Sequence, residues 1–307
     1  MLLLLISAIP FAYIISLERT KFATHVYQYH SSGFMRECAK WDQSHRRFLV
    51  SFLGGGVGQV SVPRDYLPQT VLNEVTVVKD VDLAGNASLG IVLDHPRNRL
   101  LVATLKMNSD LEVVMVDLAN LLLFIGAGDE KSLADDAAVD EEGNAYVTDA
   151  KASKIWKVGV NGEFVSIIRS PLFIAKEWYK NLVGLNGIVY HPNGFLMVIH
   201  TFSGNLFKIE TGKGEEIKLI KVEGGPLSFG DGMELLSPTK LVVAGNHPSA
   251  RLVESSDGWE TASVVAKFSG PAHRLASAAT VKDGELYLNH IIGVGYPKKH
   301  LLVQAVF

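Results

Sequence analysis

The chain of 307 residues contains a single cysteine, Cys38. It therefore has no pair of thiols for an intrachain disulfide and no thiolate cluster for zinc or an iron–sulfur centre. An excess of basic residues is also missing, because 29 Lys and Arg stand against 32 Asp and Glu. A protein whose main partner is nucleic acid needs such an excess to neutralise phosphates, so nucleic acid is not expected as a partner.

Long apolar runs are absent except at the amino terminus. Residues 2–17 carry no charge, and Glu18 and Arg19 end the run. As a helix this run reaches roughly 24 Å, less than the ~30 Å of a hydrocarbon core. We interpret residues 1–20 as a hydrophobic leader, either a signal peptide or a short signal anchor; the alternative is an ordinary buried strand or helix.

The leader carries two further expectations. It predicts a place in the secretory pathway (ER lumen, vacuole or extracellular space), with membrane contact only if the leader stays uncleaved. Asn86, in the only N-x-S/T sequon of the chain, is then a candidate glycosylation site.

Residues 21–307 consist of short β-rich runs separated by Gly, Asn, Asp and Pro, with no linker or low-complexity tract. Six segments share one pattern: a polar or small start, two or three apolar residues, a polar turn and an apolar strand. The residues that enter these turns are Asp42, Asp94, Asp140, His191, Leu236 and Lys282, at spacings of 52, 46, 51, 45 and 46. This period predicts an all-β fold, a six-bladed β-propeller with a central channel. We expect the segments around 24–30 and 300–307 to close the ring.

Residues at equivalent positions of the inner strands form a ring around such a channel. Five positions before each turn stand Glu37, Leu89, Asp135, Asn186, Asp231 and Ser277. Four of these six carry a carboxylate or amide oxygen, and carboxylates that converge on a narrow axis repel one another unless a cation lies among them. Hard oxygen donors favour Ca²⁺ or Mg²⁺ over softer metals. We expect one axial Ca²⁺, with Mg²⁺, Mn²⁺ and Zn²⁺ as alternatives; its role is either catalytic or limited to holding the blades together.

Short motifs at these positions resemble those of the gluconolactonase/regucalcin-like six-bladed propellers, in the calcium-dependent phosphotriesterase superfamily. The motifs are Glu37 with Trp41, Asp135-Asp136, Asn186-Gly187 and Asp231-Gly232. Glu37 and Trp41 match G-E-G-P-x-W without its flanking Gly and Pro. Asp135 stands where the family usually has asparagine, so the four residues carry three carboxylates.

The resemblance implies a function. It implies that Glu37, Asp135, Asn186 and Asp231 bind one catalytic divalent cation, most often calcium in the family. It also implies hydrolysis of a lactone or related ester of a small molecule by metal-activated water. Asp231 would act as the base, with Glu37 as a second catalytic residue.

Residues near the mouth of the channel are candidates for contact with that small molecule. His200 and His290 lie near the ends of predicted strands, and Trp178 lies in the long loop of residues 169–184. The alternatives are packed or surface imidazoles and a surface helix at the side of the propeller.

Two other functions stay open. One is a metal-independent condensing or cyclising enzyme of the strictosidine synthase type, which the four retained oxygen ligands disfavour. The other is a non-catalytic propeller that binds through a blade face. No stable protein partner is implied by the residues.

Overall fold

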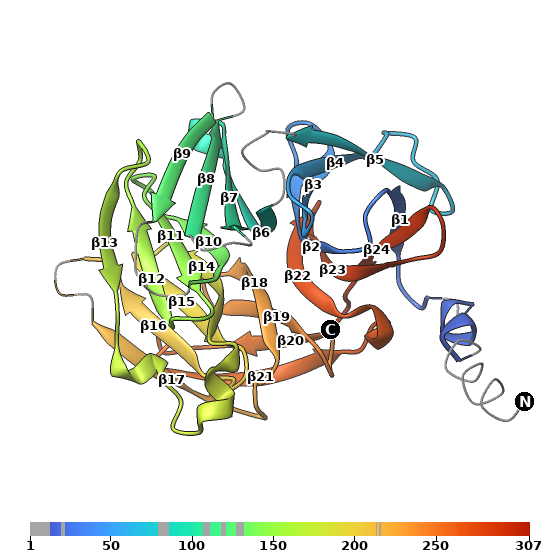
Figure 1. Ribbon diagram of the computed structural model, residues 1–307. Coiled ribbons are helices and arrows are strands. Elements are labelled where there is room, and N and C mark those ends of the chain that lie inside the picture. Colours follow the sequence, from blue (N-terminus) through green and yellow to red (C-terminus); the bar gives the residue numbers. More distant parts are fainter. Residues whose placement is uncertain are drawn as a thin grey trace, which may run out of the picture.

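The computed structural model describes residues 13–19, 22–78, 86–106, 111–117, 121–126, 132–212, 214 and 216–307. At residue 86 and within 106–126 it describes the backbone only. The strands form six blades around a central axis (Figure 1), and each blade has four antiparallel strands. This confirms the predicted all-β, six-bladed propeller.

Each blade has an inner strand at the axis, followed outward by a second, a third and an outer strand. Blade one has β2 (Arg36–Asp42), β3 (Arg47–Phe52), β4 (Val57–Ser61) and β5 (Val71–Val78); blade two has β6 (Asn86–Asp94), β7 (Arg99–Lys106), β8 (Leu111–Asp117) and β9 (Leu121–Gly126); blade three has β10 (Ala134–Val139), β11 (Ala145–Asp149), β12 (Lys154–Val158) and β13 (Phe164–Ile168). Blade four has β14 (Leu185–His191), β15 (Phe195–His200), β16 (Leu206–Glu210) and β17 (Ile217–Glu223); blade five has β18 (Gly230–Ser237), β19 (Lys240–Gly245), β20 (Ala250–Glu254) and β21 (Thr261–Phe268); blade six has β22 (Ala276–Lys282), β23 (Glu285–Val294), β24 (Lys298–Gln304) and β1 (Val26–Ser31). Short 3-10 helices are η1 (His95–Arg97), η2 (Pro171–Phe173), η3 (Trp178–Leu182) and η4 (Ala272–Arg274).

The two ends of the chain close the ring. Strand β1 pairs antiparallel with β24, so that Val26 lies opposite Val303 and Ser31 opposite Lys298. It also pairs in parallel with β5 of blade one. The closing segments expected from the sequence therefore meet in blade six, and the pairing removes two sheet edges that an open array would expose.

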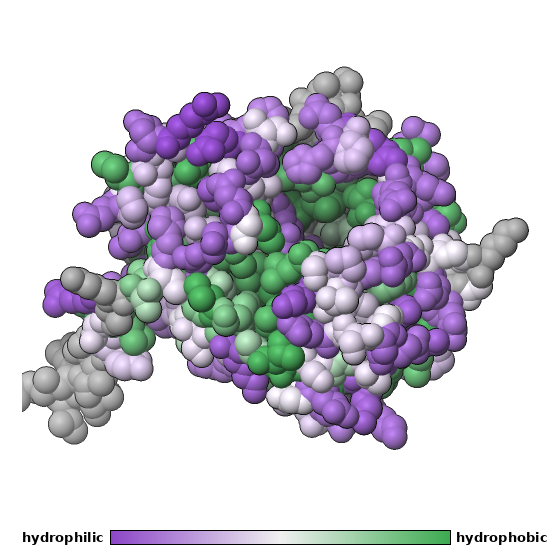
Figure 2. Space-filling view, turned by 180° about the vertical axis from the view of Figure 1, so that it is seen from behind, coloured by the Kyte–Doolittle hydropathy of each residue, from purple (hydrophilic) through white to green (hydrophobic). Residues whose placement is uncertain are grey.

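The hydrophobic core lies between neighbouring blades. One cluster joins Leu101 and Ala103 of β7 to Val147 and Trp156 of blade three. Another joins blades four and five through residues such as Met197. Figure 2 shows one face of the molecule, on which hydrophobic residues gather in and around a central hollow while hydrophilic residues cover most of the periphery. This packing holds the inner strands at fixed positions around the axis.

Part of the leader is described and is docked onto blade six. Residues 13–18 form a single short helical segment. Glu18 accepts hydrogen bonds from the fully buried Arg274 and from His273, next to β22. Burial opposes ionisation of Glu18, but these two partners outweigh it and lower its pKa to about 2. The remaining residues of the 1–20 leader lie outside the described residues. No described helix is long and apolar enough to cross a membrane.

A buried ion pair fixes the beginning of β2, where the ring of candidate ligands starts. Nε and Nη2 of Arg36 donate hydrogen bonds to the Glu74 carboxylate of β5, at 2.5 and 2.7 Å, and both side chains are 3% exposed. The guanidinium also lies over the Phe52 ring, 3.9 Å from its centroid. Removal of one partner would leave the other charge buried without compensation.

We expect Glu74→Gln to lower the free energy of unfolding by about 3–5 kcal/mol, because it leaves Arg36 buried without a counter-charge. Glu223→Gln is the matched control: its pair with Lys221 is exposed, and we expect no measurable loss of stability. Urea denaturation of both variants measures the difference. Equal losses in the two variants would contradict the assignment.

Candidate metal centre

A β-bulge recurs at the start of every inner strand and aims the candidate ligands at the axis. The pairing of inner and second strands shifts between Arg36 and Ala39, and equivalent shifts occur in the other five blades. Glu37, Asp135, Asn186 and Asp231 each lie inside such a shift, as the second residue of their strands. A bulge leaves its extra residue unpaired and redirects the side chain, so the same local geometry brings all four toward the axis.

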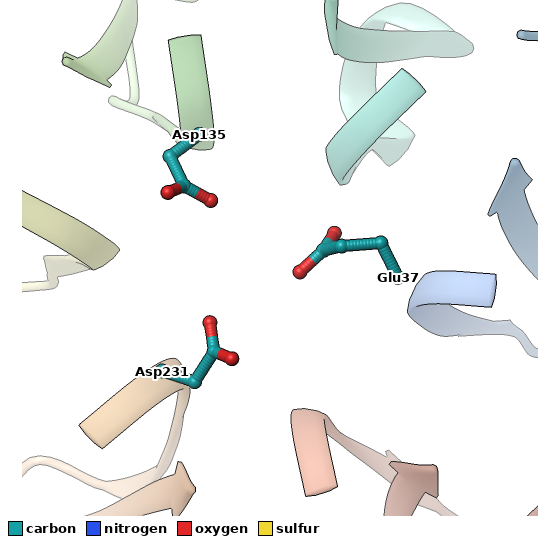
Figure 3. Close-up of side chains that lie close together, drawn as sticks. All are labelled: Glu37, Asp135 and Asp231. Atoms are coloured by element: carbon teal, nitrogen blue, oxygen red, sulfur yellow. The ribbon is translucent and has the colours of Figure 1, made fainter. Parts of the chain in front are cut away.

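Three of the predicted ligands converge closely. One carboxylate oxygen each from Glu37, Asp135 and Asp231 lies within 4.8 Å of the other two. Figure 3 shows the three side chains reaching from β2, β10 and β18 toward a common point. Glu37 and Asp135 are buried, and Oε2 of Glu37 has no hydrogen-bond partner among the described residues. An orphaned buried carboxylate oxygen of this kind suits a metal ligand.

Asn186 of β14 supplies the fourth side chain. It is buried, lines a small cavity together with Glu37, and its amide hydrogen-bonds the carboxylate of Asp231. The four side chains from blades one, three, four and five therefore form one continuous set of oxygen donors, in which Asn186 orients Asp231.

Repulsion among the carboxylates of the centre favours the binding of a cation. Burial, and then the charges of Asp231, Asp135 and Asp136, raise the pKa of Glu37 well above its usual value. Burial, and then the charges of Asp231, Asp136 and Asp149, raise the pKa of Asp135. Burial, and then the charge of Asp136, raise the pKa of Asp231 to about 7, although Asn186 and the Gly232 amide bond to it. Without a counter-ion the site therefore holds protons, and a divalent cation can replace them.

Glycines after the ligands let neighbouring inner strands approach closely. A Cβ on Gly187 would lie 2.2 Å from the carbonyl oxygen of Asp231, and one on Gly232 would lie 2.7 Å from that of Ser277. The N-G and D-G motifs therefore have a steric reason: a larger residue would push the strands apart and widen the ring.

Blade six supports the site without a carboxylate. The Asn289 side chain donates to the carbonyl oxygens of Arg36 and Glu37, at 2.7 and 2.9 Å, and to Ser277 Oγ. The Ser277 hydroxyl in turn donates to the carbonyl of Glu37. In blades one and three, Ser51 and Thr148 accept the bulge amides of Cys38 and Asp136. These bonds satisfy the backbone groups that the bulges leave unpaired.

A second charged layer lies below the ring. Lys40 Nζ lies 2.7 Å from Glu234 Oε2 and donates to the Ala279 carbonyl. Asp136 accepts from the amides of Ala137 and Ile188; burial raises its pKa to about 6, and the charge of Lys40 opposes that rise. The cavity between the layers has a volume of about 10 Å³, room for one water.

Sequence reasoning missed this lower layer, although a signal for it exists. Lys40 and Glu234 each follow a ligand by three positions, and Asp136 follows one directly. The count that found the ring, moved three residues along, would have found Lys40 and Glu234.

The histidines expected to contact substrate are buried and neutral. Burial lowers the pKa of His200 to about 4 and that of His290 to about 3. Neither belongs to the converging group, which among the described residues comprises Glu37, Asp135 and Asp231. Each has an Nε2 atom without a hydrogen-bond partner in the described part of the chain. A role in substrate contact stays a prediction for both.

Two other candidate residues, Trp178 and Asn86, are not part of the converging group found among the described residues. Trp178 begins η3 and is 76% exposed. Asn86 begins β6, and its side chain is outside what the structure describes. A cavity of about 630 Å³ lies between the leader helix and blades five and six, not at the carboxylates.

Comparisons with known proteins support the fold alone. No protein-family model and no curated protein matches the sequence. A gluconolactonase from Xanthomonas campestris, XC5397, has a similar structure (TM-score 0.59, 14% identity, covering 90% of this chain and 88% of that one). So does a catalytically inactive virginiamycin B lyase from Staphylococcus aureus with quinupristin (0.56, 9%, 92% and 99%). U3-55K is also similar (0.61, 6%, 94% and 100%). The shared architecture is a β-propeller.

The raised pKa values make the stability of the metal-free protein depend on pH. Between about pH 4 and 7 the folded carboxylates of the centre hold protons that the unfolded chain has lost, so their contribution to stability falls as pH rises through this range. The buried neutral His200, His290 and His300 contribute in the opposite direction, because the unfolded chain holds protons there that the folded chain does not. At pH 7 we expect removal of the bound metal by EDTA to lower the melting temperature by roughly 5 °C or more, and added Ca²⁺ to restore it. Differential scanning calorimetry measures both.

Asp231→Asn serves as the control for this pH effect, because it removes one of the titrating carboxylates. In EDTA we expect the melting temperature of Asp231→Asn to rise relative to that of the wild type between pH 4 and 7, because the contribution of the histidines is common to both proteins and cancels in the comparison. A difference between the two proteins that does not change over this range would refute the electrostatic account.

Proposed function

We propose that this protein is a calcium-dependent hydrolase that opens a lactone or related ester of a small molecule. The observation that carries the proposal is the meeting of three carboxylates and one amide, from four separate blades, at one point on the propeller axis. Such a set consists only of hard oxygen donors, which suits Ca²⁺.

The residues present fit a divalent cation. Glu37, Asp135, Asn186 and Asp231 would hold it, with the unpartnered Oε2 of Glu37 among the donors. When bound, the cation supplies a Lewis acid that polarises a carbonyl oxygen and acidifies water. Ca²⁺ takes six to eight ligands, so four protein side chains leave positions for substrate and water.

Asp231 is the residue to which we assign the proton transfer. Its carboxylate takes a proton from the attacking water while the water oxygen forms a bond to the carbonyl carbon. The bond from that carbon to the ring or ester oxygen then breaks, and the proton passes to the departing alkoxide. Asn186, hydrogen-bonded to Asp231, keeps the carboxylate in one orientation.

Asp135 distinguishes this centre from one with an asparagine in its place. Three carboxylates bring a charge of −3, so a divalent cation leaves −1 on the shell. The extra charge favours tight cation binding, and it disfavours an anionic substrate close to the ion. We therefore propose an uncharged lactone or ester as the substrate.

The structural similarity to a gluconolactonase supports the proposal only at the level of fold. Propellers of this shape also occur in a lyase and in U3-55K, so the fold does not choose between catalysis and binding. The leader supports a place in the secretory pathway, where glycosylation at Asn86 is testable by glycosidase digestion. Measurements of metal binding and turnover separate the functional alternatives.

Calcium binding is the first test. We expect one Ca²⁺ per chain by isothermal titration calorimetry, and at least about 100-fold weaker binding in Glu37→Ala and Asn186→Ala, because each loses an oxygen donor. Glu223→Gln, which alters an exposed carboxylate, is the control and should bind as the wild type does. A wild type that binds no divalent cation would end the proposal in favour of a metal-independent enzyme or a binding module.

Turnover is the second test, with a panel of uncharged lactones and aryl esters as substrates. We expect EDTA to abolish hydrolysis, and Asp231→Asn to keep most of its Ca²⁺ affinity but lose about 10²–10⁴-fold in kcat, because the base is missing. Full activity of Asp231→Asn would show that the base is another residue. Ca²⁺ binding with no hydrolysis of any panel member would favour a cation-stabilised binding module.

A further inference from the structure

One rim of the propeller carries both the metal centre and the longest described loop, residues 169–184. Each ligand is the second residue of its inner strand, so the loops before the inner strands leave from this rim. Because the strands of a blade are antiparallel, the turns between second and third strands leave from it too. We call it the ligand face. Its described loops are residues 32–35, 169–184, 224–229 and 269–275 before inner strands, and 53–56, 150–153, 201–205, 246–249 and 295–297 between second and third strands.

The loop of residues 169–184 exposes large hydrophobic side chains in unusual number. They are Leu172 (48% exposed), Ile174 (54%), Trp178 (76%), Tyr179 (50%) and Leu182 (51%). Lys176 and Lys180 stand among them. The loop thus combines Trp and Tyr with neighbouring Lys residues and exposed aliphatic side chains. This combination is typical of segments at a membrane–water interface.

This exposure is held in place by the structure of the loop. Phe173 is fully buried and packs edge-on against Phe207 of blade four, with ring centroids 5.2 Å apart. The Asn181 side chain accepts from the Ala175 amide and donates to the Ala175 carbonyl, both at 2.8 Å. The Ser170 hydroxyl accepts from the amide of Leu172 at the start of η2. The loop is thus anchored from below while its other apolar side chains point to solvent.

Other loops of the ligand face expose aromatic side chains as well. Phe34, Phe229 and Tyr296 are 50%, 55% and 99% exposed. By contrast, the described turns of the opposite rim expose one large hydrophobic side chain, Leu67, and the C-terminal tail adds residues 306 and 307. Apolar exposure therefore favours the face that bears the metal centre.

The leader reaches the molecule at the same face. Glu18, bonded to Arg274 and His273 in the loop before β22, fixes the helix of residues 13–18 there. Tyr13, Ile14 and other residues of this helix are exposed. The chain before it, residues 2–12, has no charged residue. An uncharged apolar segment therefore meets the propeller at the ligand face. This favours a lipid surface, rather than a groove of another protein, as the partner of that face.

We propose that the ligand face rests on a lipid bilayer, with loop 169–184 in the interfacial layer beside the leader. This goes beyond an anchor at the end of a tether, because it fixes the orientation of the propeller and turns the channel mouth toward the lipid. If the proposed hydrolase function holds, the substrate is a lipophilic lactone or ester that enters from the membrane.

The tryptophans provide a direct test in the full-length protein. Trp41, Trp156 and Trp259 are at most 6% exposed, so Trp178 is the reporter of contact. Vesicles of phosphatidylcholine and phosphatidylserine with brominated acyl chains are added, and emission is compared between the wild type and Trp178→Phe. We expect the difference between them, which is the Trp178 emission, to shift to shorter wavelength and to lose most of its intensity.

Leu67→Trp in the Trp178→Phe background is the matched control, because it moves an exposed tryptophan to the opposite rim. We expect its emission to stay unquenched by the same vesicles. Calcium removal should not alter the quenching of Trp178, so failure of the hydrolase function and failure of membrane docking are separable.

Three results would overturn the proposal. In the first, the protein floats with vesicles but Trp178 is not quenched, so the leader tethers a propeller whose ligand face points away. In the second, Trp178 and the tryptophan at position 67 are quenched equally. In the third, Trp178 emission shifts with protein concentration in the absence of vesicles, so that a second copy of the chain covers the loop.

Discussion

The structure depends on how it accommodates the mutual repulsion of three carboxylates, two of them buried and one partly buried. Glu37, Asp135 and Asp231 come from different blades, and the packing between blades decides how far apart they lie. Coulomb repulsion at such distances in a buried site is strong enough to hold protons on the acids or to draw in a cation. The centre is therefore both the candidate functional site and a place where charge repulsion opposes the packing of the blades.

The same backbone feature recurs in each blade and holds the ligands in place despite this repulsion. The bulge at the start of each inner strand turns the ligand toward the axis, and the glycine after Asn186 and Asp231 lets the next strand come close. Hydroxyl and amide side chains, such as Ser51 and Asn289, take up the backbone groups that the bulges free. Below the ring, Lys40 supplies a fixed positive charge beside Glu234 and Asp136. The Lys40 ammonium group thus neutralises part of the negative charge in the channel.

Much of the fold could be predicted because the blades repeat. A polar turn after each inner strand recurs at a period of about 48 residues, and five positions before that turn lies the second residue of β2, β10, β14 and β18. A simple count therefore found Glu37 and its three partners. The count works because inner strands of similar length begin with the same bulge.

The rest depends on tertiary structure that a period does not encode. A bulge changes which side chains face the axis, so the position of Asp136 required the folded pairing. His200 stands at the end of a strand, where sequence alone does not separate a channel residue from a packed one; burial in the folded blade makes it neutral. The apolar surface of loop 169–184 likewise depends on the folded blade, which buries Phe173 and leaves its neighbours Leu172 and Ile174 exposed.

Blade six combines β1 with three strands from the other end of the chain, and this affects when the ring can close during translation. Its outer strand, β1, is translated before every other strand of the ring, and its partner β24 is translated after all of them. Until β24 has been translated, β1 lacks that partner, and the nascent ring stays open. Pairing of β1 with β24 therefore marks the moment at which the strands of all six blades are present.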